Sequence, residues 1–333
     1  MSDFNYKMWK DKYQNHSLNP WRIVFVFYIG TFLYAKSPVN PATFCHFKTL
    51  IEEIKIIMKK KFLQSAFLLA ALSLAFVACK KNDAAPPAPT VVKEWTIPLA
   101  AKFENTPPAG RTETGTANLQ LLSDNSIKYT ITITGLASGD ALNAAHIHTG
   151  DVITNGGVIV GFNPTFTGST ATGTVTGLRP TFVDSLKDNM NELYFNVHST
   201  QVPGGLVRGQ LNTNIEMAEY VTLSGINEVP AVTTSATGIA LLRLTSDKKL
   251  YSKIIVSNLE PGDVLNAAHL HKAAAGANAG VFLGLYGSGA EFGTTKIITL
   301  TDAAIITSLK TDAMYVNAHS TAKPGGIIRG QVR

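Results

Sequence analysis

The chain has 333 residues, of which 45% are hydrophobic, a composition typical of a globular protein with room for two or three domains. The formal net charge of +6 comes entirely from residues 1–78, which hold ten Lys or Arg and four Asp or Glu, so the rest of the chain carries 19 charges of each sign. This neutral remainder gives no indication of nucleic-acid binding, and we expect no nucleic-acid partner.

Residues 58–78 have the pattern of a bacterial lipoprotein signal peptide. A run of lysines after Met58 is followed by an apolar segment, 62–78, that is too short to be a convincing membrane span. The small residue Ala78 then precedes Cys79, an arrangement that resembles a lipobox, in which the cysteine is lipidated. We therefore expect a lipoprotein anchored by Cys79 in the bacterial cell envelope, at the outer membrane and facing the periplasm or the surface. An ordinary signal peptide cleaved nearby is the alternative.

The segments on either side of this signal are expected to lie outside the folded domains. Residues 1–57 include an apolar run, 23–34, that is shorter than the roughly 20 residues a membrane helix needs. We interpret 1–57 as an over-extended N-terminus, with translation from Met58, and a real N-terminal anchor is the alternative. Residues 79–93 are rich in Pro and Ala and are expected to form a tether. The only cysteine besides Cys79 is Cys45, so the exported domains rely on hydrophobic cores rather than disulfides.

From Glu94 onwards the chain has the pattern of short β-strands. Segments rich in Thr, Val and Ile alternate polar and apolar residues and are separated by Gly, Asn, Asp and Pro, as in antiparallel sheets. One segment, Arg179–Asn189, has helical spacing, with Phe182, Leu186 and Met190 on one face. The expected strands of this region are Trp95–Ala101, Gly115–Leu122, Ile127–Thr134, Asn143–His148, Gly157–Gly161, Thr170–Thr176, Glu192–His198 and Leu206–Asn212.

The same order of segments occurs twice. His146 recurs as His269 after 123 residues, and His198 recurs as His319 after 121 residues. A period of about 120 residues indicates duplication of a whole domain, because solenoid repeats are shorter. The chain is therefore expected to be all-β, with two tandem antiparallel β-sandwich or barrel domains that touch across a short junction at 213–220. The expected domains are residues 94–213 and 217–333.

Three separated motifs in each repeat carry a resemblance to a known family. They are AAHIH at 144–148, NVHST at 196–200 and PGGLVRGQL at 203–211, and then AAHLH at 267–271, NAHST at 317–321 and PGGIIRGQV at 324–332. Together they resemble the CHRD domain, which is named from the animal protein chordin and is present in many bacterial exported proteins. The resemblance covers about 95–211 and 220–332. It implies an immunoglobulin-like β-barrel with limited similarity to copper/zinc superoxide dismutases, and no settled activity for the bacterial members.

An earlier motif of that family, a Glu followed by Val and Pro, is present at 228–230. We align it with residues 105–107 of the first repeat, which places Asn105 at the position of Glu228. This alignment predicts that the first domain lacks the carboxylate.

Six of the eight histidines fall in these motifs and are candidate metal ligands. Residues i and i+2 of a strand share a face, so His146 and His148 are expected to point away from the core side formed by Ala145 and Ile147. Two such histidines and a third from another strand suffice for zinc or copper coordination with an open fourth position. The candidate ligands are His146, His148 and His198 in the first domain and His269, His271 and His319 in the second.

Two other interpretations of the same residues compete with a metal site. The preferred one is a structural hydrogen-bonded network that ties the Pro-Gly-Gly hairpin to the strand with the paired histidines, and the other is surface recognition. The arginines would place positive charge near a cation, which argues against a metal. The additional members of the expected network are Asn196, Arg208, Asn317 and Arg329.

Other catalytic patterns are weak or absent. The sequence has no GxSxG, no HExxH and no phosphate-binding GxxxxGK[ST], and Gly276–Gly289 lacks the lysine of such a loop and is expected to be a flexible connection.

The leading functional hypothesis is therefore a non-enzymatic exported lipoprotein with an extracytoplasmic binding or envelope-structural role. Its partners would be the membrane, through the lipid anchor, and an unidentified extracytoplasmic protein or ligand. The alternative is a zinc or copper protein. A dismutase-like activity is disfavoured because the resemblance to that family would call for more ligands and a disulfide.

Overall fold

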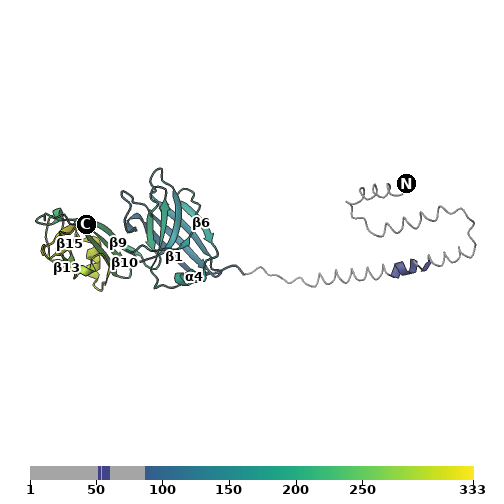
Figure 1. Cartoon of the computed structure of the whole chain (residues 1–333). Helices are drawn as coiled ribbons and strands as arrows, with labels where there is room; N and C mark the ends of the chain where they lie inside the picture. Colours follow the sequence, from purple (N-terminus) through teal and green to yellow (C-terminus); the bar gives the residue numbers. More distant parts are fainter. Residues whose placement is uncertain (1–51, 54, 61–86) are drawn as a thin grey trace, which may run out of the picture. The chain divides into compact units, whose positions relative to one another are not determined.

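The computed structural model describes residues 52–53, 55–60 and 87–333, which belong to two separate units divided after Pro86 (Figure 1). The described residues of the first unit are helical. Among all described residues, no helix is long and apolar enough to cross a membrane. The predicted lipidation site Cys79, most of the predicted signal at 58–78 and the first part of the tether lie outside the described residues.

The second unit consists of two eight-stranded antiparallel sheets with the same strand order. The first sheet has the order β5-β4-β7-β8-β1-β2-β3-β6, and the second has the order β13-β12-β15-β16-β9-β10-β11-β14. The predicted fold class, two tandem all-β domains with antiparallel sandwich or barrel sheets, is confirmed. The strands of the first domain are β1 (Val91–Ala100), β2 (Thr114–Leu122), β3 (Ile127–Thr134), β4 (Leu142–Thr149), β5 (Val158–Gly161), β6 (Thr170–Val175), β7 (Leu193–Ser199) and β8 (Val207–Gln210). Those of the second are β9 (Ile215–Ser224), β10 (Thr237–Thr245), β11 (Lys249–Ser257), β12 (Leu265–His271), β13 (Val281–Tyr286), β14 (Lys296–Thr299), β15 (Tyr315–Ser320) and β16 (Ile328–Gln331).

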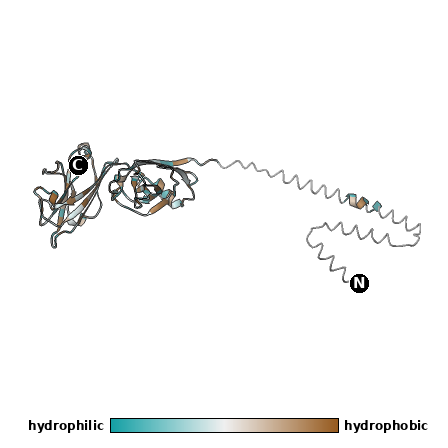
Figure 2. Ribbon diagram, turned by 90° about the horizontal axis from the view of Figure 1, so that it is seen from above, coloured by the Kyte–Doolittle hydropathy of each residue, from teal (hydrophilic) through white to brown (hydrophobic). Residues whose placement is uncertain are grey.

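Alternating polarity explains why these segments form strands around a core. In β3, Ile127, Tyr129 and Ile131 are buried, while Lys128 and Thr130 between them are exposed. Side chains of a strand alternate between its two faces, so this pattern presents one apolar face to the domain interior. Figure 2 shows hydrophobic and hydrophilic residues interspersed along the strands. All eight predicted strands are confirmed, with ends shifted by a few residues.

Each domain buries its own hydrophobic core. The core of the first domain includes Ile97, Leu119 and Phe195, and that of the second includes Leu242, Ile254 and Val316 in a separate cluster. Burial of apolar surface provides the main stabilisation of such domains, at about 25 cal/mol per Å². No cysteine occurs in residues 87–333, so the cores stabilise the domains without disulfides.

Each β-domain also has one α-helix that packs against its hydrophobic core. The predicted helix is confirmed as α4 (Pro180–Lys187), but it packs through Val183 and Leu186, and Met190 lies beyond its end with 86% of its surface exposed. The expectation that Met190 shares the apolar face is therefore wrong. A second helix, α5 (Ala303–Thr311), was not predicted; the Asp302 side chain caps its N-terminus by accepting a hydrogen bond from the Ala304 N–H at 2.8 Å.

Two boundary predictions require correction. Gly276–Gly289 is not one flexible connection, because β13 lies inside it and pairs with β12. The second domain begins before the predicted residue 217, since β9 starts at Ile215 and pairs with β10 from that residue on. Only a few residues therefore join β8 to β9.

The two β-domains touch, as predicted from the short junction. The loop at 150–157 of the first domain inserts Val152 and Ile153 into a buried cluster with Leu241 of β10 and Tyr251 of β11. The Tyr251 hydroxyl also donates a hydrogen bond to Glu192 Oε1 at 3.0 Å. This contact covers the outer face of the second sheet with a loop of the first domain.

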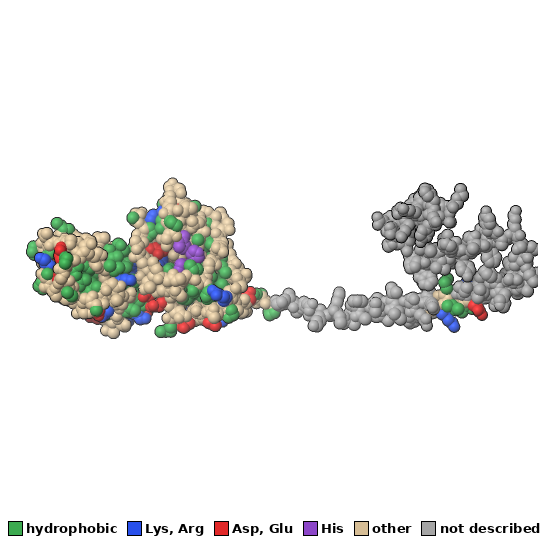
Figure 3. Space-filling model, viewed as in Figure 1, with side chains coloured by type: hydrophobic (Ala, Val, Ile, Leu, Met, Phe, Trp, Pro, Cys, Tyr) green, Lys and Arg blue, Asp and Glu red, His purple; other side chains and the backbone are tan. Residues whose placement is uncertain are grey.

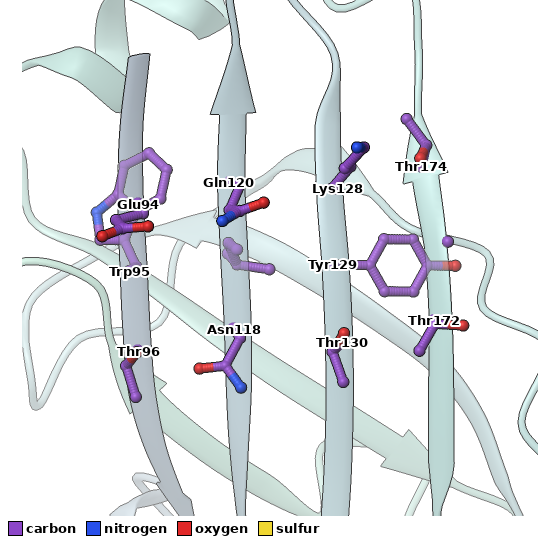
Figure 4. A pocket seen from close by; sticks show the side chains of 12 residues that line it. Glu94, Trp95, Thr96, Asn118, Gln120, Lys128, Tyr129, Thr130, Thr172 and Thr174 are labelled. Atoms are coloured by element: carbon purple, nitrogen blue, oxygen red, sulfur yellow. The ribbon is translucent and has the colours of Figure 1, made fainter. Parts of the chain in front are cut away.

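The equivalent outer face of the first sheet is polar and forms a shallow hollow (Figure 4). Asn118, Gln120 and Lys128 lie 123 residues before Leu241, Arg243 and Tyr251, so polar side chains take the places of the docking residues. No neighbouring domain covers this face in the described structure, which explains why the sequence keeps it hydrophilic.

Candidate functional site

Neighbouring strands bring the three motif histidines of each domain together. In the first domain, His146 and His148 lie on β4, and His198 lies on β7, which pairs with β4 so that His146 is opposite Asn196. One ring nitrogen of each histidine lies within 4.8 Å of the others, and the second domain repeats this arrangement. Figure 3 shows histidine side chains gathered at the surface of the first β-domain.

The predicted division of faces holds in the structure. Ala145 and Ile147 are fully buried in the hydrophobic core, whereas His146 and His148 point to the other side and are partly buried. The loop at 150–157 covers this side. The histidines are therefore neither core residues nor free surface residues.

In the first domain, backbone carbonyl groups fix the orientation of two imidazole rings. His198 Nδ1 lies 2.9 Å from the carbonyl oxygen of Pro203 in the hairpin, and His148 Nδ1 lies 3.0 Å from that of Gly156 in the loop. His198 Nε2 faces His146 Nδ1 at 3.0 Å. His148 Nε2 is buried and has no hydrogen-bond partner among the described residues.

The second domain has the same arrangement with different loop residues. His319 Nδ1 lies 3.0 Å from the carbonyl oxygen of Pro324, and His271 Nδ1 lies 2.9 Å from that of Ala279. His319 Nε2 faces His269 Nδ1 at 3.1 Å. The positions of both carbonyl groups are therefore maintained although the loop sequences differ.

These contacts determine which ring nitrogens can bind a cation. A carbonyl oxygen only accepts hydrogen bonds, so in each domain two histidines carry their hydrogen on Nδ1, and their Nε2 lone pairs face the centre of the cluster. Metal-binding histidines typically donate the other ring N–H to a carbonyl or carboxylate in this manner. A metal ion at the centre of the cluster could therefore bind these Nε2 lone pairs.

The rings are also disposed to stay neutral. Burial lowers the pKa of His146, His148 and His269, and the neighbouring histidines lower it further. Burial likewise lowers the pKa of His319. Because the neutral imidazole is the form that binds metals, this environment favours a ligand state near neutral pH.

A stacked tyrosine and arginine lie behind each histidine cluster. The Tyr194 ring stacks on His148 with a centroid distance of 4.8 Å, and the Arg208 guanidinium lies 3.4 Å from the Tyr194 centroid. Tyr315 and Arg329 repeat the stack in the second domain at 4.6 Å and 3.3 Å. The tyrosine ring thus separates the positive charge from the imidazoles.

The arginines make their hydrogen bonds to the covering loops. Arg208 donates to Asn155 Oδ1 at 2.7 Å and to the Thr154 carbonyl at 3.0 Å, and Arg329 donates to Asn278 Oδ1 at 3.1 Å. Of the predicted network residues, Asn196 and Asn317 therefore contact the histidines. Arg208 and Arg329 instead bind the loops that cover the clusters. Asn155 and Asn278 were not identified from sequence, although their separation of 123 residues, equal to that of the paired histidines, could have revealed them.

A buried carboxyl group lies beside each cluster, which corrects the alignment of the early motif. Glu104 and Glu228 both follow a single 3-10 turn, η1 (Ala101–Phe103) and η2 (Gly225–Asn227), and both lie against the second glycine of the hairpin, Gly205 or Gly326. Glu104, and not Asn105, is thus the equivalent of Glu228, and the first domain retains the carboxylate. The first repeat has one more residue than the second between this glutamate and the following proline, and the sequence alignment was therefore shifted by one position.

Burial raises the pKa of both carboxyl groups to about 7, although the nearby arginines oppose the rise. Glu104 is also within electrostatic reach of Arg243 of the second domain, whose guanidinium donates a hydrogen bond to the Glu104 carbonyl oxygen at 3.0 Å. Oε1 of each glutamate is buried and lacks a hydrogen-bond partner among the described residues. Each site therefore contains an unpartnered carboxyl oxygen, and the first site also contains an unpartnered imidazole nitrogen, His148 Nε2.

Comparison with known proteins supports the duplication and the resemblance seen in the motifs. The family model described as the CHRD domain matches residues 95–211 and again 220–332. No curated protein and no solved structure matches the chain. The two matches cover more than half of the chain and coincide with its two sheets, and the chain therefore belongs to the CHRD-domain family, with two such domains in tandem.

Proposed function

We propose that this chain is a non-enzymatic exported lipoprotein whose two CHRD domains each bind one zinc or copper ion. The observation that carries the proposal is the repeated set of converging histidines with backbone-anchored Nδ1 atoms. Imidazole nitrogens suit both metals, since both ions accept neutral nitrogen ligands.

In a purely structural network, His146 Nδ1 can donate a hydrogen bond to His198 Nε2, but the His148 Nε2 lone pair keeps no donor. A neutral imidazole has one N–H, and in His148 and His271 the backbone carbonyl uses it. The remaining Nε2 atom of His148 is buried without a donor, which costs about 1–3 kcal/mol for a typical polar group. A bound cation removes this cost, and a hydrogen-bonded network alone does not.

The local charges are compatible with a cation. The sequence predicts that Arg208 and Arg329 lie near the histidines, where their positive charge would oppose a metal ion. In the structure each guanidinium lies behind a tyrosine ring and beside a buried carboxyl group, Glu104 or Glu228. With its pKa raised to about 7, each carboxyl group is partly ionised at neutral pH and offsets part of the positive charge of the arginine.

The chemistry favours binding over catalysis of the dismutase type. Residues 87–333 contain no cysteine for a disulfide, and the described residues of each domain hold one cluster of three candidate ligands. The signal-like segment 58–78 and Cys79 support export and membrane attachment. We therefore infer a metal-holding or metal-stabilised binding module in the cell envelope.

Metal analysis of the chain from Lys80 to Arg333, prepared without chelator, tests this proposal. After equilibration with excess zinc or copper and desalting, we expect about two equivalents per chain, one for each cluster. The double variant His198→Ala, His319→Ala should retain almost none. Less than ~0.2 equivalents on the unaltered chain contradicts the proposal, given the tight binding typical of folded metal sites.

A further inference from the structure

The side chains of Asn196 and Asn317 occupy the remaining side of each histidine cluster. In the second domain, Asn317 Oδ1 lies 3.0 Å from His271 Nε2 and 3.0 Å from His319 Nε2. In the first domain, Asn196 Oδ1 lies 3.1 Å from His198 Nε2. Both asparagines are almost fully buried.

We propose that Asn196 and Asn317 are metal ligands that donate an amide oxygen and complete a site of three nitrogens and one oxygen. This inference rests on the proposed metal binding. It adds a fourth protein ligand to each site, and it changes the expected chemistry of the site.

The Asn317 oxygen lies close to two imidazole nitrogens that have no hydrogen directed at it. His271 and His319 both have the Nδ1 hydrogen directed at a backbone carbonyl, so each Nε2 is a lone pair. The carbonyl oxygen of the Asn317 amide is also an acceptor. The amide oxygen thus lies 3.0 Å from two imidazole lone pairs, and these contacts are repulsive in a buried site unless a cation lies among the three atoms.

The glutamate on the far side of each asparagine sets the orientation of its side-chain amide. Asn317 Nδ2 and Glu228 Oε1 lie together against Gly326. Asn196 Nδ2 and Glu104 Oε1 lie together against Gly205 in the same way. Because a carboxylate accepts hydrogen bonds, the NH₂ group faces the glutamate and the oxygen faces the histidines. Glu104 and Glu228 are therefore positioning residues for the ligand oxygen.

The spacing of the candidate ligand atoms also fits a metal site. Around zinc, with bonds of about 2.0–2.2 Å to nitrogen and oxygen, tetrahedral ligands are roughly 3.4 Å apart. The separations of 3.0 Å and 3.1 Å between the asparagine oxygen and the imidazole nitrogens are close to this value. The widest separation among the histidine nitrogens, up to 4.8 Å, requires a small rotation of a ring on metal binding, and His146 and His269 are exposed enough to make it.

A fourth protein ligand has a functional consequence. Structural zinc sites have four protein ligands, whereas catalytic sites have three and keep a position for water or substrate. A closed site of three imidazoles and one amide oxygen holds a metal without exposing a reactive position. A fourth ligand from asparagine would thus favour a site that binds a metal or stabilises the domain over a catalytic site.

Cobalt(II) substitution and zinc affinity of the full chain can test this inference at the second site. The variant His198→Ala serves as the background, so that the first site does not contribute. In this background, Asn317→Leu removes the oxygen at similar size, Asn317→Asp retains an oxygen ligand, and Glu228→Gln removes only the charge behind the amide. The exposed Asn118→Leu on β2 is a matched control.

We expect strong four-coordinate cobalt absorption from the background protein and from the Asp and control variants. Asn317→Leu should weaken and shift this absorption, because water replaces the amide oxygen, and should lower zinc affinity by about 10–100-fold. Glu228→Gln should change the absorption and the zinc affinity in the same direction. The Asp variant distinguishes ligand loss from misfolding, because it keeps the spectrum only if the oxygen coordinates.

Two outcomes lead to different conclusions. If the background protein binds cobalt and zinc and Asn317→Leu leaves both the spectrum and the affinity unchanged, the asparagine is not a ligand and the inference is wrong, while metal binding stands. If the background protein and the unaltered chain bind neither ion, metal binding itself fails.

Discussion

At the residue scale, the two domains differ in how an equivalent aspartate is held. In the first domain, Arg111 Nη2 lies 2.8 Å from Glu113 Oε1 and 2.5 Å from Asp140 Oδ2, and all three side chains are largely buried. Asp263 is the equivalent of Asp140, but Thr234 and Ala236 take the places of Arg111 and Glu113. The buried ion pairs are therefore specific to the first domain.

These contacts predict a pH-dependent contribution of Asp140 to stability. Burial alone would raise the pKa of Asp140, but hydrogen bonds from Ser199 and Arg111 outweigh it and hold the pKa well below its usual range. A lowered folded-state pKa stabilises the protein above the unfolded value, near pH 4, and the contribution is lost as the pH falls towards the folded value. At pH 7, Asp140→Asn should destabilise the first domain by about 1–3 kcal/mol, since it weakens the charged hydrogen bonds of Asp140 while Arg111 keeps Glu113 as a partner.

Denaturant unfolding at several pH values measures this effect. The difference between the unaltered chain and Asp140→Asn should be largest above pH 5 and should shrink towards pH 2. Asp263→Asn, which has no buried arginine partner, is the control and should cost less at pH 7. A difference that stays constant down to pH 2 would show that the ion pairs do not set the pKa of Asp140.

At the scale of elements, the loop at 150–157 connects the first histidine cluster to the domain interface. Its Gly156 carbonyl orients His148, its Thr154 carbonyl and Asn155 hold Arg208, and its Val152 packs on the second domain. The equivalent loop of the second domain has Ala275 in place of Val152, and Ala275 is exposed. Only the first site therefore has a loop that is held in place by a neighbouring domain.

This difference predicts that a charge at Val152 will separate the domains. In Val152→Asp a carboxylate would be buried against Leu241 and Tyr251, which is strongly unfavourable without a partner. Calorimetry should show the unfolding temperature of the first domain falling by several degrees, with two resolved transitions. The matched substitution Ala275→Asp should leave the unfolding profile nearly unchanged. Equal effects of the two substitutions would contradict the docking role of the loop.

At the scale of the whole molecule, the two domains have different outer surfaces. The second sheet presents Leu241, Arg243 and Tyr251 to the first domain, whereas the first sheet presents a polar face (Figure 4). The loop that would dock on a third domain carries alanine and glycine in place of Val152 and Ile153. The loop of the second domain therefore lacks the apolar residues that dock the first domain on its neighbour.

The proposed membrane attachment predicts a lipidated N-terminus. Mass spectrometry of the protein isolated from its native membrane should find an acylated Cys79 as the first residue, because the lipobox-like pattern places the cleavage before it. Cys79→Ala should abolish the acylation and release the protein from the membrane fraction. Peptides from residues 1–57 in the native protein would contradict the inferred start at Met58.

Local sequence patterns predicted the strands well, because the alternation in segments such as 127–134 depends only on neighbouring residues. The pairing of His146 with His148 on one face followed from the same period of two. Residues that act through distant contacts were not predictable in this way. Glu104 was misaligned because its equivalence to Glu228 depends on the position of the hairpin glycine, which only the folded chain reveals. The helix α5 was missed because its apolar face is short, with Leu309 as its one fully buried residue.

The central claim is that each CHRD domain holds one metal ion among its three histidines, and anomalous X-ray diffraction from zinc-soaked crystals tests it most directly. We predict one strong anomalous peak per domain, within about 2.0–2.2 Å of ring nitrogens of His146, His148 and His198 in the first domain and of the equivalent histidines in the second. Crystals grown from the His198→Ala variant should lose the peak in the first domain and keep the other. An anomalous map without density at either cluster, at zinc concentrations that saturate ordinary histidine sites, would contradict the claim.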